Sequence, residues 1–127
     1  MNYSPLTRAH FEAANGAGTL QGADVVRGEA GSRAGGTWVQ FDLRLAPAPH
    51  GAPEIIEARF LAFGCPHTIA VADWLVGQVP GTRLVAALPE TVNAVQQRFG
   101  VPVEKRGRLL VIEDAWRAAA RAGRGER

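Results

Sequence analysis

The stretch of residues 37–45 constrains the fold most, because apolar and polar side chains alternate along it. Its apolar positions are Val39, Phe41, Leu43 and Leu45. A period of two places these side chains on one face of a strand and the intervening ones on the other. We therefore predict a sheet strand with one face in the core. Its polar face carries Trp38, Gln40, Asp42 and Arg44.

A second strand follows after a short loop. Residues 46–53 consist largely of alanine, proline and glycine, which is typical of a turn. Residues 54–63 then place Ile56, Ala58, Phe60 and Ala62 on one side of a strand. A loop this short cannot form a parallel crossover, so the two strands should pair antiparallel. Residues 19–29 indicate a third strand before them.

Four segments carry helix signals, namely capping residues, stop residues or an apolar stripe of helical period. They are a short helix opened by Ser4-Pro5 and ended by Asn15-Gly16, one from Cys65 to about Gly77, one from Leu88 to Phe99 with Pro89 at its start and Gly100 after it, and one from Leu109 through Ala119. The last could also be a buried strand, but its length favours a helix. Residues 82–87 could add one or two helical turns.

Strands followed by helices are typical of an α+β domain. We expect an antiparallel sheet of about three strands with the C-terminal helices packed on one face. A chain of 127 residues is long enough for one hydrophobic core and too short for two, so we expect a single domain over residues 1–127. Residues 122–127 have the composition of a basic, frayed tail.

Composition narrows the classes of function. Cys65 is the only cysteine, which excludes an internal disulfide and any metal site that takes two thiolates from one chain. No apolar run approaches the roughly 20 residues of a membrane span, and no secretory signal is visible, so we expect a cytoplasmic protein without membrane contact. The net charge is only +2 and most arginines are scattered, which argues against nucleic-acid binding.

Several short motifs lie along the chain. They are Tyr3, His10-Phe11 and Asn15-Gly16 near the start, residues 55–60, Phe63-Gly64-Cys65, Ile69-Ala70 and Gly77 in the middle, and Glu113-Asp114-Ala115 near the end. Together they resemble the IscU/NifU N-terminal family of iron–sulfur cluster assembly scaffolds. The resemblance implies an antiparallel sheet with helices on one side, the same fold class that the periodicity predicts.

The resemblance also implies a metal site from which this chain departs. The family holds an iron–sulfur cluster or zinc through three cysteines, an aspartate and a histidine. Cys65 matches the middle cysteine, whereas the other two cysteine motifs fall on Gly35-Gly36-Thr37 and Gly107-Arg108. A cluster or a structural zinc ion needs about four ligands, so we expect no cluster or zinc on a single chain.

Candidate metal ligands within one chain are Cys65, His67 and Asp73. We expect His67 to be a surface residue of the first helical turn and Asp73 to be an exposed helix residue, which leaves the set incomplete. An alternative is a metal or cluster carrier in which the two subunits of a homodimer pool Cys65 and His67 across a twofold axis.

A further alternative is a thiol or persulfide-handling site at Cys65. If the family fold holds, Arg108 opens the last helix near the turn that carries Cys65. A helix N-terminus and a guanidinium would both favour the thiolate, whereas a buried cysteine would be inert. Spacing alone brings no histidine to Cys65, and no phosphate-binding glycine loop is present, so we do not expect an enzyme.

The family also carries a proline-rich loop that a DnaK-type chaperone recognises. The corresponding residues here are Val101, Pro102, Val103 and Lys105. An ordinary loop after a helix stop is the alternative. We therefore predict a protein associated with iron–sulfur cluster assembly that has lost most of its metal site and acts by contact with other proteins of cluster biogenesis.

Overall fold

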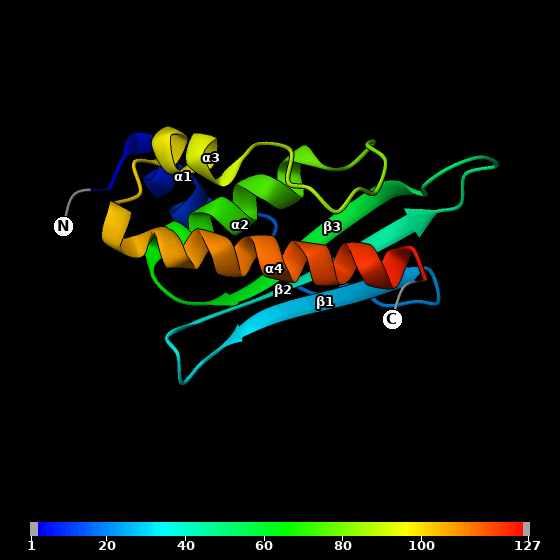
Figure 1. The fold of residues 1–127 in the computed structure, drawn as a ribbon, viewed down its shortest axis with the longest axis horizontal. Coiled ribbons are helices and arrows are strands. Elements are labelled where there is room, and N and C mark those ends of the chain that lie inside the picture. Colours follow the sequence, from blue (N-terminus) through cyan, green and yellow to red (C-terminus); the bar gives the residue numbers. More distant parts are fainter. Residues whose placement is uncertain (1–2, 126–127) are drawn as a thin grey trace.

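The structure is a computed structural model that describes residues 3–125. Its elements are α1 (Pro5–Ala13), β1 (Val25–Ser32), β2 (Thr37–Ala46), β3 (Glu54–Phe63), α2 (Pro66–Gln78), α3 (Val92–Phe99), the 3-10 turn η1 (Val103–Lys105) and α4 (Arg106–Gly123). Figure 1 shows α4 running lengthwise beside the sheet, with α2 next to it and α1 and α3 gathered at one end. The predicted α+β class is confirmed.

The three strands form one antiparallel sheet in the order β1-β2-β3. β2 pairs with β3 as predicted, with Phe41 opposite Phe60. β1 begins at Val25, later than the predicted start of the third strand at residue 19, because residues 19–24 form no strand and lead into β1 through a turn. Gly16 and Gly18 instead exchange backbone hydrogen bonds with Phe60 on the outer edge of β3. That edge is therefore covered by the chain itself.

The core lies between the sheet and the helices. Val39, Phe41 and Leu43 of β2 are fully buried, and Phe41 packs edge-on against Trp116 of α4 with ring centroids 5.7 Å apart. The predicted core position of Ile56 is wrong, since its side chain is 49% exposed. A bulge opposite Arg44 and Leu45 shifts the register by one residue and buries Ile55 in its place.

The other face of the sheet is not simply polar and open, as its alternation predicted. Asp42 is only 1% exposed, because Leu20 lies over it and donates its N–H to the carboxylate at 2.9 Å. Arg27 of β1 makes two further hydrogen bonds to Asp42, at 2.7 and 2.9 Å. Burial raises the pKa of Asp42, but the hydrogen bonds from Arg27, Leu20 and Gln40 and the Arg27 charge outweigh it and lower that pKa overall.

Helix ends follow the predicted caps with two differences. Ser4 caps α1 by accepting the N–H of Thr7 at 3.1 Å, and Gly100 ends α3 in a left-handed conformation. α3 begins at Val92, after the predicted start, because Thr91 provides the cap. Residues 82–87 form no helix, and Arg83 makes a β-bridge to Glu54 instead.

The last segment is helical, as its length predicted. α4 continues through Gly123, so residues 122 and 123 of the predicted frayed tail belong to the helix. Residues 126 and 127 of that tail lie outside the described residues. Across residues 3–125, none of the helices has both the length and the apolar character that a membrane crossing needs.

Candidate functional site

Cys65 stands between β3 and α2, at one end of the sheet. It is the N-cap of α2, followed by Pro66 at the first helical position, and its carbonyl accepts the N–H of Thr68 at 3.0 Å. The thiol is half-buried. Its Sγ lies 3.7 Å from the hydroxyl of Thr68 and 3.9 Å from Nδ1 of His67.

Several groups act on the ionisation of Cys65. Burial is the largest influence and raises the pKa of the thiol. Against it act the backbone N–H and hydroxyl of Thr68, the backbone N–H of His67 and the positive charge of Arg108. Together these groups lower the pKa of Cys65 below its ordinary value, which shifts the thiol–thiolate equilibrium toward the thiolate.

His67 is buried, which contradicts the expectation of a surface histidine. His67 is 2% exposed, because Tyr3 packs edge-on against the imidazole with ring centroids 4.8 Å apart. Burial is the main cause that lowers the pKa of His67, and the charges of Lys105 and Arg108 lower it further. These influences favour the neutral imidazole, and the nearby positive charges oppose the binding of a proton or a metal ion.

Asp73 is also buried, and the expectation of an exposed helix residue is wrong. It is 7% exposed, and its two oxygens accept hydrogen bonds from Nδ1 of His10 at 2.7 Å and from the N–H of Gly16 at 2.8 Å. It lies eight positions after Cys65 in the sequence, which is about 12 Å along the helix axis. Asp73 therefore joins α2 to α1 and does not face Cys65.

The residues around Cys65 do not fit a bound metal ion or cluster on one chain. Within residues 3–125, no three side chains of histidine, cysteine, aspartate or glutamate are arranged to hold a metal. Of the candidate ligands, only Cys65 and His67 come together. The charge of Arg108 acts on both residues and that of Lys105 acts on His67, and positive charge repels a cation.

The two segments that match the family's other cysteine motifs meet in space. Gly35 and Thr37 of the β1–β2 turn, and Gly107 and Arg108 of α4, line one cavity of about 340 Å³. The two segments that the resemblance matched to cysteine motifs therefore lie side by side, and they carry glycine, threonine and arginine at the matched positions. Ser32 and Glu104 line the same cavity, and no sequence motif pointed to either residue.

Comparison with known proteins establishes the family. The family model described as the NifU-like N terminal domain matches residues 2–125. The chain belongs to this NifU-like family. Over 91 residues it is 38% identical to the nitrogen fixation protein NifU of Cereibacter sphaeroides, which covers 71% of this chain and 35% of that protein. Over 119 residues it is 29% identical to the bifunctional protein NifU/MnmA of Rubrobacter xylanophilus, covering 91% and 23% of the two lengths.

Two solved structures share the fold of this NifU-like domain. One is a putative iron-sulfur cluster assembly scaffold protein for the SUF system from Fervidobacterium islandicum AW-1, with a TM-score of 0.66 and 13% identity over 93% of this chain and 96% of that one. The other is the N-terminal part of a nitrogen-fixing NifU-like protein from Brucella abortus, with a TM-score of 0.69 and 14% identity over 98% and 95%. At these identities the likeness concerns the fold.

The segment of the NifU-like domain that resembles the family's chaperone-recognised loop contains a short 3-10 turn. Val101 is buried and donates its N–H to the carbonyl of Gln96 at 3.0 Å. Pro102 caps the 3-10 turn η1, which contains Val103 and Lys105. The side chain of Val103 is 77% exposed. Of the two valines, only Val103 is therefore available to a partner.

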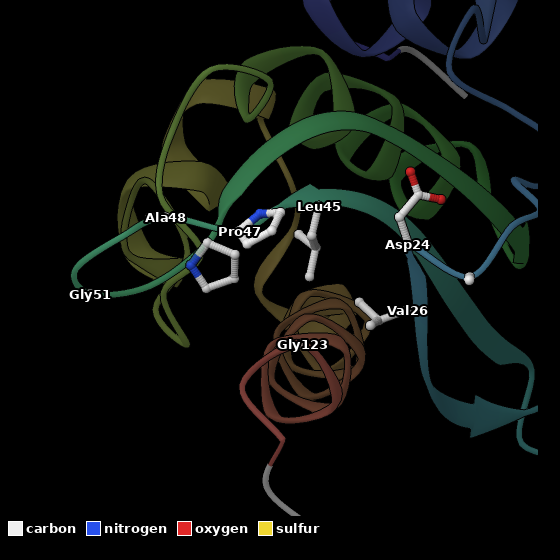
Figure 2. A pocket seen from close by; sticks show the side chains of 9 residues that line it. Asp24, Val26, Leu45, Pro47, Ala48, Gly51 and Gly123 are labelled. Atoms are coloured by element: carbon white, nitrogen blue, oxygen red, sulfur yellow. The ribbon is translucent and has the colours of Figure 1, made fainter.

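A second cavity of the NifU-like domain lies at the opposite end of the sheet from Cys65. It measures about 450 Å³, and Val26, Leu45 and Gly123 line it (Figure 2). Among residues 3–125, Asp24 is its one acidic lining residue, and that carboxylate pairs with Arg44 at 2.6 Å. With this carboxylate already paired, the cavity adds no reactive group to the candidate site.

Proposed function

We propose that this NifU-like domain takes part in iron–sulfur cluster assembly in the cytoplasm by contact with other proteins of that process. It neither catalyses a reaction nor holds a cluster on a single chain. The family and the scaffold named among its structural relatives support the assembly role. The observation that carries the rest is the composition of the site, where no third histidine, cysteine or acidic ligand of residues 3–125 joins Cys65 and His67 and where the charge of Arg108 acts on both.

An exposed aromatic patch beside Cys65 supports a role in protein contact. Trp38 and Phe63 lie opposite each other on β2 and β3, and Phe63 is 43% exposed. The guanidinium of Arg33 lies over both rings, 6.0 Å from the Trp38 centroid and 5.5 Å from that of Phe63. Aromatic and arginine side chains are the residue types enriched in the centres of protein interfaces.

Anaerobic reconstitution tests this proposal. The purified chain is incubated with iron and sulfide, desalted, and analysed by visible absorption and by metal and sulfide content per chain, beside a Cys65→Ser control. We expect the wild type to retain no more iron than the control. One cluster per chain that depends on Cys65 would refute the proposal. One cluster per two chains, eluting as a dimer, would support the alternative of a carrier with ligands from two subunits.

The contact itself is tested at the aromatic patch. The double variant Trp38→Ala/Phe63→Ala should lose binding to the sulfur-donating enzyme of an iron–sulfur assembly system from the same genome, measured by calorimetry. Phe11→Ala is a matched control, since Phe11 is 40% exposed on α1 and lies outside the patch. Equal binding by the wild type and the double variant would exclude this surface as the contact.

A second candidate function is the transient carriage of sulfur by Cys65, which the lowered pKa of this thiol favours. In this reaction the Cys65 thiolate attacks the outer sulfur of a donor persulfide. The donor S–S bond breaks, the donor leaves as a thiolate, and Cys65 becomes the persulfide. Incubation with a small-molecule persulfide, followed by intact mass measurement, should show the gain of one sulfur atom. The Cys65→Ser variant should show no gain, and equal labelling of both proteins would exclude Cys65 as the acceptor.

A further inference from the structure

β1 forms an open edge of the sheet. The strand order β1-β2-β3 leaves one side of β1 without a neighbouring strand, whereas the outer edge of β3 is covered by Gly16 and Gly18. Figure 1 shows β1 on the outside of the sheet, with β2 on its other side. Arg27 and Glu29 are exposed along this edge. Such an edge is a template for pairing, because its outward backbone groups can bond to another strand.

The backbone groups of Arg27 and Glu29 point away from β2. In an antiparallel pair, each strand exchanges hydrogen bonds with its neighbour at every second residue. The carbonyl of Asp24 accepts the N–H of Leu45 at 2.9 Å, so the later bonds from β1 to β2 come from the even-numbered residues. The N–H of Val25 bonds within the preceding turn, as this alternation requires. Within residues 3–125, no backbone hydrogen bond outside the β1–β2 ladder reaches Arg27 or Glu29.

α4 excludes a second copy of this chain as the strand that pairs there. A Cβ built at Gly28 would overlap the backbone of Ala118 and Ala119, so α4 lies directly over β1. Two antiparallel copies of β1 are related by a twofold axis perpendicular to the sheet, which puts both α4 helices on the same face. The strands would be about 4.8 Å apart, whereas packed helices need about 8–10 Å between their axes. The helices would collide, so the partner has to be an extended segment without a helix on that face.

The charges along the edge favour a basic residue in the partner. Arg27 is paired with Asp42 by two hydrogen bonds, at 2.7 and 2.9 Å. The charge of Arg27 also acts on Glu29, but the carboxylate of Glu29 accepts a hydrogen bond from Nε1 of Trp38, at 3.3 Å, and belongs to none of the ion pairs among residues 3–125. A lysine or arginine directly opposite Glu29 would supply the opposite charge.

We infer that the β1 edge binds an extended peptide segment by antiparallel strand addition, with a lysine or arginine opposite Glu29. Main-chain hydrogen bonds to Arg27 and Glu29 hold the segment, and its alternate side chains determine which sequence fits. The residue opposite Gly28 has to be small, because it lies beneath α4. The inference goes beyond the assembly role and does not depend on it.

Hydrogen exchange and nuclear magnetic resonance titration of the full chain test the inference. The probe is a capped peptide as long as β1, in which alanine alternates with threonine and one lysine replaces the threonine opposite Glu29. In the protein alone, the amides of Arg27 and Glu29 should exchange fast, whereas those of Gly28 and Ala30, which pair with β2, should exchange slowly. The peptide should shift the edge amides saturably. At about ten times its dissociation constant it should slow the exchange of Arg27 and Glu29 about tenfold.

Variants at Glu29 separate backbone pairing from charge. Glu29→Pro removes the outward N–H and leaves the bonds to β2, a placement that edge strands tolerate, and it should abolish binding. Glu29→Gln is the matched control, since it keeps that N–H, and it should bind the lysine peptide only severalfold more weakly. Glu29→Lys should prefer a peptide with glutamate in place of the lysine, a reversal that loss of structure would not produce. If Glu29→Pro does not fold, this reversal still decides the case.

The inference is overturned if the amides of Arg27 and Glu29 are already protected in the concentrated protein alone, as a dimer through β1 would make them. It is also overturned if the lysine peptide shifts no edge amide saturably, or shifts only residues away from β1. Binding by a folded Glu29→Pro variant as tight as that of the wild type would refute strand addition. An unchanged preference of Glu29→Lys for the lysine peptide would refute the assigned charge.

Discussion

Replacing Asp73 by alanine should destabilise the fold without changing metal binding. The buried carboxylate accepts hydrogen bonds from His10 of α1 and from the N–H of Gly16, and so ties α1 and the following turn to α2. Its removal leaves both donors without this acceptor. A metal ligand would behave in the opposite way, since its loss lowers metal affinity and often relieves charge repulsion in the empty site.

The size of the effect follows from the two hydrogen bonds. A hydrogen bond to a charged group contributes about 1.5–3 kcal/mol when it is buried, which applies to the bond from Gly16. The bond from His10 contributes about 0.5–1 kcal/mol, because that side chain is 29% exposed and water can replace the carboxylate. We therefore expect Asp73→Ala to lower the free energy of unfolding by about 2–4 kcal/mol.

Urea unfolding followed by tryptophan fluorescence measures this change. Asp73→Asn should lose about half as much, because its amide oxygen still accepts from Gly16. Asp114→Ala, at an exposed position of α4, is the control and should change stability by less than about 0.5 kcal/mol. A loss below about 0.5 kcal/mol for Asp73→Ala, or a weaker zinc affinity in that variant, would refute the structural role.

Three further predictions concern Cys65, Asp42 and Gly28. Alkylation rates of Cys65 measured against pH should give an apparent pKa below that of free cysteine. Arg108→Gln should raise this apparent pKa because a positive charge is lost. The same pH dependence of alkylation in both proteins would exclude the influence of Arg108 on Cys65. Because the pKa of Asp42 is lowered in the folded state, the stability that its carboxylate contributes is present above the unfolded-state pKa and is lost as the pH falls through the folded-state pKa. Asp42→Asn should therefore be less stable than the wild type at pH 7 and lose less stability on acidification, measured by urea unfolding. An equal loss of stability in both proteins on acidification would contradict this. Gly28→Ala should lower the free energy of unfolding by about 1–3 kcal/mol, measured with denaturant, because a Cβ there would overlap the backbone of α4. Gly107→Ala is the control, since its Cβ meets open space and should leave the stability unchanged or slightly raised. Equal effects of the two variants would contradict the close approach of Gly28 to α4.

Local signals in the sequence were sufficient for most of the fold. Alternation along residues 37–45 predicted which side chains face the core, and Val39, Phe41 and Leu43 are fully buried there, although Asp42 on the other face is buried as well. Capping by Ser4 and the stop at Gly100 also depend on neighbouring residues alone. The bulge that buries Ile55 instead of Ile56 could not be predicted, because it depends on how β3 pairs with its neighbour rather than on the pattern within β3.

The candidate site was predictable only in part, because burial and pairing there come from distant segments. Tyr3 covers His67, and His10 binds Asp73 across 63 positions of sequence, so neither side chain could be recognised as buried from its own helix. The proximity of Arg108 to Cys65 came from the family resemblance and not from spacing. The cavity polar groups Ser32 and Glu104 carry no local signal at all.

Metal content per chain decides whether Cys65 belongs to a metal site. In the proposed function the chain holds no metal because Gly35, Thr37 and Arg108, which line one cavity, stand where the resemblance places ligands. Wild-type protein should therefore contain far less than one zinc ion per chain after purification with zinc present. The triple variant Gly35→Cys/Thr37→Asp/Arg108→Cys should gain about one zinc ion per chain. One tightly bound zinc in the wild type that is lost in Cys65→Ser, or no gain in a folded triple variant, would contradict the account.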